Sequence, residues 1–178
     1  MSYNIPIIDN LSDYKPYISE DIRPYIREKE ENNSLIYHYT LYPHDDNLWN
    51  NSFLREARGI SFDKNTGQIK SRPFHKFFNL HEVPETRRDV LFNNISDYNP
   101  ILVFDKFDGS LIIVEYDKNN NLICRTKRTY DNIQAQLATE ILNKKSFLFK
   151  EYIKILLSKN FINFLMFISW KSIFYCYI

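Results

Sequence analysis

The chain contains only three glycines, Gly59, Gly67 and Gly109, among its 178 residues. Glycine averages roughly 7% of protein residues, so about a dozen would be ordinary at this length. It is the residue that adopts left-handed backbone and lets another segment approach closely. We therefore expect each of these few glycines to stand at a turn or a close approach, and the segments around them are the first places to look for function.

The composition suits one folded domain. Hydrophobic residues make up 44% of the chain, enough for a sizeable core, which excludes a chain that is disordered throughout. The 23 basic and 22 acidic residues give a net charge of +1, which excludes a strongly basic tail but leaves a local basic patch open. Two cysteines without metal-site spacing favour a reducing compartment, and the N-terminus shows no signal peptide, so a cytoplasmic location is expected.

Local patterns in the first half predict short elements and one hairpin. A helix is expected near 18–30, with Ser19 as its N-cap, and a strand over 35–42. Residues 57–63 and 68–74 read as a hairpin whose turn is Asn65-Thr66-Gly67, with Gly67 at positive φ. A short strand or loop is expected over 76–80, followed by a charged connector with one helical turn over 81–100.

The second half predicts a buried strand over 101–105, then a hairpin of strands 110–117 and 122–127. Helical spacing follows over 131–145 and 146–158, with Ile133, Leu137, Ile141 and Leu142 on one side of the first helix. Residues 161–178 are strongly apolar. Buried β structure is the favoured interpretation, because aromatic residues are abundant there; a membrane anchor is the alternative, against which Lys171 counts about 3 kcal/mol.

The sharpest chemical signal is Lys106, which directly follows the apolar strand in the segment KFDGS. In an extended chain residues i and i+2 face the same way, so Lys106 and Asp108 can share one pocket, and Gly109 allows a close approach of backbone. The reference lysine pKa of about 10.4 falls on burial and beside other cations, which makes the amine a nucleophile. Arg58, Lys76, Arg125 and Lys127 are candidate cations for this effect. A surface lysine in a turn is the competing interpretation.

Four segments together resemble a known family. KFDGS matches the K-x-D-G motif of covalent nucleotidyltransferases, the ATP-dependent ligases and mRNA capping enzymes. EARGI at 56–60, SRPFHKFFNL at 71–80 and RTK at 125–127 are similar, in the same order, to segments of the phage-type RNA ligase 1 family. The resemblance covers about residues 35 to 160. It implies an α+β adenylation (nucleotidyltransferase) domain of antiparallel sheets with flanking helices.

The resemblance also implies an activity and roles for particular residues. The enzyme would be an ATP-dependent RNA ligase, a polynucleotide 5′-adenylyltransferase using Mg²⁺, in which Lys106 attacks the α-phosphate of ATP and AMP then passes to an RNA 5′-phosphate for sealing to a 3′-hydroxyl. RNA repair, tRNA included, is the expected role, in a phage-like setting. The nucleotide would be held by a set drawn from several motifs: Arg58, Lys76, Phe78, Lys127, Asp108, Gly109 and either Tyr37 or Tyr39, which alternation places on one face. No metal ligand is assigned.

The match to the family fails in one region. The family carries a glutamate on a strand that would correspond to residues 164–170, where FLMFISW has no acid. We therefore hypothesise a partial adenylation domain over 1–160, lacking its C-terminal part, with a tail at 161–178 that is non-native or frame-shifted. A second polypeptide supplying the missing half is conceivable on this hypothesis. The alternatives are an inactive remnant that only binds nucleotide or RNA, a membrane-tethered protein and, less favoured, a DNA ligase or capping enzyme.

Overall fold

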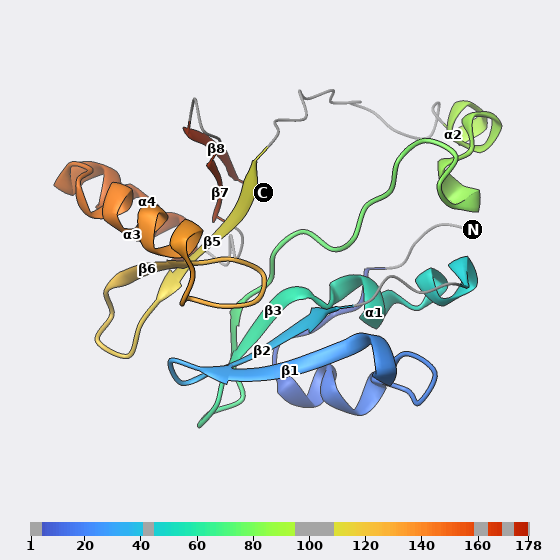
Figure 1. Cartoon of the computed structure of the whole chain (residues 1–178), viewed down its shortest axis with the longest axis horizontal. Helices are drawn as coiled ribbons and strands as arrows, with labels where there is room; N and C mark the ends of the chain where they lie inside the picture. The colour runs from blue at the N-terminus through green and yellow to red at the C-terminus, as the bar shows by residue number, and fades with distance from the viewer. Residues whose placement is uncertain (1–4, 41–44, 95–108, 159–163, 169–172, 178) are drawn as a thin grey trace.

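The computed structural model describes residues 5–40, 45–94, 109–158, 164–168 and 173–177. Figure 1 shows two antiparallel sheets, with the paired helices α3 and α4 beside the second sheet and a long connection leading from the first sheet out to α2. The first sheet has the strand order β1-β2-β3-β4 and the second β6-β5-β7-β8. The strands are β1 (Ile26–Glu31), β2 (Ser34–Tyr39), β3 (Arg58–Asp63), β4 (Ile69–Ser71), β5 (Ser110–Tyr116), β6 (Leu122–Arg125), β7 (Phe164–Ile168) and β8 (Ile173–Tyr177). The α-helices are α1 (Ser52–Glu56), α2 (Arg88–Asn94), α3 (Ile133–Asn143) and α4 (Phe147–Ser158), and the 3₁₀ helices are η1 (Leu11–Asp13), η2 (Lys15–Tyr17), η3 (Arg23–Tyr25), η4 (Asp46–Asn50) and η5 (Pro84–Thr86).

The helix expected near 18–30 is wrong. That stretch forms only the short helix η3 and then β1, which pairs antiparallel with β2 in a register that sets Glu31 opposite Ser34. The two strands meet at Asn32 and Asn33, both in left-handed backbone with φ of 49° and 57°. Two successive positive φ values define a tight hairpin turn, and Asn tolerates them better than most residues. This turn, rather than helix propensity, decides the structure of the charged segment before it.

The hairpin of β3 and β4 is confirmed, as is the role of Gly67 at its turn. Gly67 has φ of +73°, and the Asp63 carboxylate accepts hydrogen bonds of 2.9 Å from the backbone N–H groups of Asn65 and Thr66. The outer face of this sheet packs on a core rich in aromatic side chains, among them Tyr14, Tyr37, Trp49 and Phe62. The sheet is thereby held rigid at the ends of β2 and β3, where the candidate site residues lie.

The second sheet confirms the hairpin of β5 and β6 and both expected helices. Ile133 and Leu137 are 76% and 46% exposed, whereas Ala135, Ala138 and Leu142 are buried. Alanines let the helix approach β6 closely, and the Thr139 hydroxyl accepts a 3.1 Å hydrogen bond from the Cys124 backbone N–H there. The inner contacts of the helix are therefore made by its alanines together with Leu142, whereas Ile133 and Leu137 are exposed.

Within the apolar C-terminal segment, the described residues 164–168 and 173–177 form β-strands, as expected. β7 pairs with β5 and β8 pairs with β7, both antiparallel. Within the described ranges, no helix has the length and apolar character needed to cross a bilayer. Upstream, residues 76–80 are a loop and the connector after them contains η5 and α2. The strand expected over 101–105 lies outside the described residues.

Candidate functional site

Gly59 brings the two sheets together. Its φ is +104°, and a Cβ built there would lie 2.9 Å from the Lys127 Cα and 3.0 Å from the Lys127 carbonyl oxygen. Only glycine leaves room for the segment after β6 to pass this close to β3. The neighbour of Gly59, Arg58, is thus set beside Lys127, although the two residues are distant in sequence.

A buried network of hydrogen bonds links the two sheets at this close approach. The guanidinium of Arg125, which is fully buried, donates to the Glu115 carboxylate at 3.1 Å, to the Gly59 carbonyl at 2.6 Å and to the Ser71 hydroxyl at 2.5 Å. Ser61 also donates to Glu115, at 3.1 Å. Arg125 was expected as one of the cations that lower the pKa of a nucleophilic lysine. In the structure it has a carboxylate partner in the interior and links the two sheets, and its position relative to Lys106 lies outside the described residues.

Arg58 is the first residue of β3 and precedes Gly59, where the two sheets approach each other. Its guanidinium lies over the Phe77 ring, 4.5 Å from the ring centroid, and donates to the His75 backbone carbonyl at 3.5 Å. Burial lowers the pKa of Arg58. The nearby Glu56 carboxylate accepts a hydrogen bond from Arg72 at 2.8 Å.

Lys76 and Phe78 lie together on the loop after β4. The Lys76 ammonium is 4.0 Å from the centroid of the Phe78 ring and 3.2 Å from a carboxylate oxygen of Glu82. The other side chain over that ring is Arg55, whose guanidinium lies 4.9 Å from the centroid. Phe78 also packs edge-on against Trp49 at 5.6 Å, so its position is fixed by the first core.

The two candidate tyrosines on β2 have different surroundings. The Tyr37 ring is buried in the first core, and its hydroxyl donates to Glu28 at 2.5 Å. Burial, reinforced by Glu28, raises the pKa of Tyr37. Tyr39 lies at the end of the strand with the Lys127 ammonium 4.3 Å from its ring centroid. Tyr39 is thus the tyrosine that shares contacts with the cations.

We call Tyr39, Arg58, Lys76, Phe78 and Lys127 the basic–aromatic cluster. Its cations influence one another: burial lowers the pKa of Lys76 and of Lys127, and Arg58 contributes to the lowering in both. Glu82 opposes the shift at Lys76. Cations held in place beside flat aromatic faces can bind the phosphates and the ring of a nucleotide at the same time.

Two predicted site residues cannot be placed in this geometry. Lys106 and Asp108 lie outside the described residues, and Gly109, just before β5, is exposed. Within the described ranges, no three His, Cys, Asp or Glu side chains lie close enough to hold a metal ion. The described carboxylates therefore do not fit an all-protein Mg²⁺ site.

Sequence reasoning overlooked several residues that shape the cluster. Phe77 carries the Arg58 guanidinium, Trp49 supports Tyr39 and Phe78, and Glu82 pairs with Lys76. Phe77 stands within SRPFHKFFNL and could have been singled out from that segment. No motif or pattern in the sequence indicates Trp49 or Glu82, because their contacts with the site residues form only in the folded chain.

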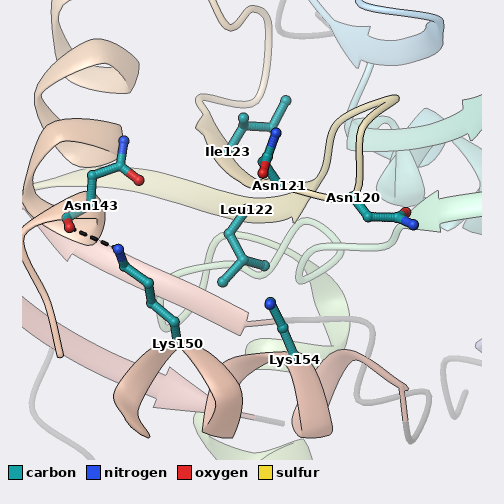
Figure 2. Close-up of a pocket in the computed structure, with 7 residues that line it drawn as sticks. All are labelled: Asn120, Asn121, Leu122, Ile123, Asn143, Lys150 and Lys154. Atoms are coloured by element: carbon teal, nitrogen blue, oxygen red, sulfur yellow. Dashed lines mark hydrogen bonds between the residues drawn. The ribbon is translucent and has the colours of Figure 1, made fainter. Parts of the chain in front are cut away.

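A separate pocket of about 340 Å³ lies between the turn after β5 and the helices α3 and α4. Figure 2 shows Asn121 and Leu122 on one side of it and Lys150 and Lys154 on the other. Lys150 donates to the Asn143 carbonyl at 2.8 Å, and Lys154 pairs with Glu151 at 2.8 Å. None of the predicted site residues lines this pocket.

Comparison with known proteins identifies the family of the chain. Residues 56–163 match the RNA ligase family, and the chain belongs to it, in the phage-type branch. It is 35% identical over 99 residues to a Thermovibrio ammonificans protein named "Putative RNA ligase", a match that covers 54% of this chain and 24% of that protein. It is 43% identical over 58 residues to RNA ligase 1 of Bacteriophage TS2126, covering 32% of this chain and 14% of that protein. The chain thus spans about a quarter or less of the curated relatives it matches.

Proposed function

We propose that this chain carries the nucleotide-binding part of an ATP-dependent RNA ligase that works through a lysyl–AMP intermediate on Lys106. The Lys106 amine, having lost a proton, forms a bond to the α-phosphorus of ATP, and the bond from that phosphorus to the bridging oxygen breaks to release pyrophosphate. AMP then passes to an RNA 5′-phosphate, and an RNA 3′-hydroxyl displaces it as the strands are sealed.

The observation that carries this proposal is the basic–aromatic cluster. Three of its members, Arg58, Lys76 and Lys127, come from three separate sequence segments. The positive charge of Arg58 contributes to the lowered pKa of both lysines. Fixed cations in such a cluster stabilise the charge that develops on a triphosphate during attack, because they are already oriented and partly shielded from water. They also favour the neutral amine on a neighbouring lysine.

Each remaining site residue has a proposed part. Phe78 and Tyr39 offer ring faces to the adenine, and Tyr39 is preferred over Tyr37, whose hydroxyl already binds Glu28. Asp108 and Gly109 would shape the backbone beside Lys106. Mg²⁺ usually binds through substrate phosphates, one or two carboxylates and water, and no step is assigned to it here.

The test is incubation of the purified chain with α-³²P-labelled ATP and Mg²⁺, followed by denaturation in SDS at neutral to alkaline pH and gel analysis. Label on the protein that survives alkali but is released by warm acid, as expected of a phosphorus–nitrogen bond, is predicted, and it should disappear in Lys106→Ala. Lys118→Ala is the matched control, because Lys118 sits in the exposed turn between β5 and β6. Label that persists in Lys106→Ala, or ATP binding without any label, would contradict the proposed function.

A further inference from the structure

His38 is a buried histidine that the proposed chemistry does not use. Its side chain is only 7% exposed, and its Nδ1 atom has no hydrogen-bond partner. His38 stands on β2 opposite Arg27 of β1 and Arg58 of β3. Directly paired residues on neighbouring strands lie about 5 Å apart at Cβ, so His38 has a basic residue beside it on each neighbouring strand.

The charges that face His38 are all positive. They are Arg125 and Lys127 from the end of β6 and the segment after it, Arg128 from the same segment, and Lys29 from β1. Arg125 is neutralised by Glu115, and Lys29 by Glu31 at 2.9 Å. Among the described residues, Lys127 and Arg128 have no carboxylate partner, and Arg128 is exposed.

Burial, assisted by these cations, keeps the imidazole neutral. Burial, with the four cations, lowers the pKa of His38 to about 4. A buried imidazole nitrogen without a partner is costly, and unpaired cations around it add to the cost. An anion bound between them would supply an acceptor for the cations and a partner for Nδ1.

The basic residues form a line across neighbouring strands of the first sheet. Arg58, on β3, belongs to the basic–aromatic cluster. His38 lies on the neighbouring strand β2, and Arg27 and Lys29 lie on the edge strand β1 beyond it. The line of charge therefore leads away from the aromatic rings that would hold a base. A single nucleotide occupies one end of such a line, whereas a polyanion can follow it.

We propose that His38, together with Arg27 and Arg128, forms a subsite for a phosphate of the RNA strand, next to the nucleotide subsite. The inference rests on the proposed function, because it identifies the bound polyanion as the ligase substrate. Its chemistry is nonetheless separate from that of Lys106: the subsite binds and orients RNA and takes no part in bond making.

The experiment measures equilibrium binding in the Lys106→Ala background, where no covalent step can occur. A 3′-fluorescein-labelled RNA oligonucleotide with a 5′-phosphate is titrated by anisotropy at several salt concentrations. Arg128→Ala is expected to weaken RNA binding about 5- to 10-fold and to reduce the slope of log affinity against log salt by about one. Lys118→Ala, which removes an exposed lysine in the turn between β5 and β6, is the control for net charge and should have less than half that effect.

A second measurement follows His38 itself by NMR of histidine labelled with ¹⁵N. Adding the RNA should shift the His38 Nδ1 resonance, assigned through His38→Asn, and raise its pKa, while His81 remains unchanged. His81→Asn is the matched histidine control, since its backbone φ of 66° suits asparagine. Titration with ATP alone separates the two phosphate sources. Unchanged RNA affinity in Arg128→Ala, or a shift at His38 with ATP and none with RNA, would overturn the subsite. Failure of Lys106 labelling would instead overturn the proposed function.

Discussion

Replacing Arg125 by methionine tests whether the buried network fastens the two sheets. The substitution keeps most of the side-chain volume but removes the donors to Glu115, Gly59 and Ser71. Glu115, only 1% exposed, would keep the single hydrogen bond from Ser61 and lose its ion-pair partner. Removing one member of a buried pair costs about 3–5 kcal/mol, a large fraction of the 5–15 kcal/mol that stabilises a typical domain.

The assay is urea unfolding followed by circular dichroism. With a slope of about 2 kcal/mol per molar urea, Arg125→Met should lower the unfolding midpoint by roughly 2 M. The double variant Arg125→Met with Glu115→Leu removes the stranded charge, so part of the loss should return, with a coupling free energy of at least about 2 kcal/mol. Lys154→Met breaks an exposed pair with Glu151, and its effect should stay below about 1 kcal/mol.

Two results would refute this reasoning. A loss below about 1 kcal/mol in Arg125→Met would mean that the Arg125–Glu115 pair contributes no more than a surface pair. Strict additivity of the two single variants would mean that Arg125 and Glu115 act independently, despite the 3.1 Å separation of their charged atoms.

Three further predictions concern the same region. Gly59→Ala should cost at least about 2 kcal/mol more than Gly67→Ala in urea unfolding, since both glycines have positive φ but only at Gly59 would the new Cβ lie within 3.0 Å of Lys127 backbone; equal losses would show that strain alone matters. The pKa of His38 is about 4, below its ordinary value of 6.5, so the stability that it contributes is complete above pH 6.5 and declines as the pH falls toward 4, by up to about 3 kcal/mol; an unfolding midpoint that does not change over this window would contradict a neutral, buried His38. Burial raises the pKa of Cys124 to about 12, so alkylation by iodoacetamide at pH 7.5 should be more than about 100-fold slower in the folded than in the urea-unfolded protein, as mass spectrometry of its peptide would measure, and equal rates would count against its burial.

Local sequence predicted those parts of the fold that local chemistry decides. The hairpin at Gly67 and the hairpin of β5 and β6 follow from turn residues, such as Asp117, whose carboxylate accepts from the backbone N–H groups of Asn119 and Asn121. The charged segment of β1 was misread as helix, because its pairing with β2 depends on a turn whose two asparagines were overlooked. On α3 the spacing grouped Ile133 and Leu137 with Leu142, but only packing in the fold decides that Leu142 is buried while the other two are exposed.

For the candidate site, the sequence predicted which segments contribute residues but not how the side chains are arranged. The motifs brought Arg58, Lys76 and Lys127 to attention, and folding sets them near one another. Their roles, and that of Lys106, stay predictions. The pairing of Arg125 with Glu115 could not be foreseen, because it depends on the register between β5 and β6 and on the approach to Gly59. The different surroundings of Tyr37 and Tyr39 likewise depend on a register irregularity in β2, just after Tyr37.

The order of strands in the second sheet has a consequence for biosynthesis. β5 is bordered by β6, its immediate successor, and by β7, which is translated only after both helices. Until residues 164–168 have left the ribosome, one row of β5 backbone donors and acceptors has no strand beside it. Such an open edge invites pairing with other nascent chains, so the ribosome-bound protein should be a better chaperone client than the finished one.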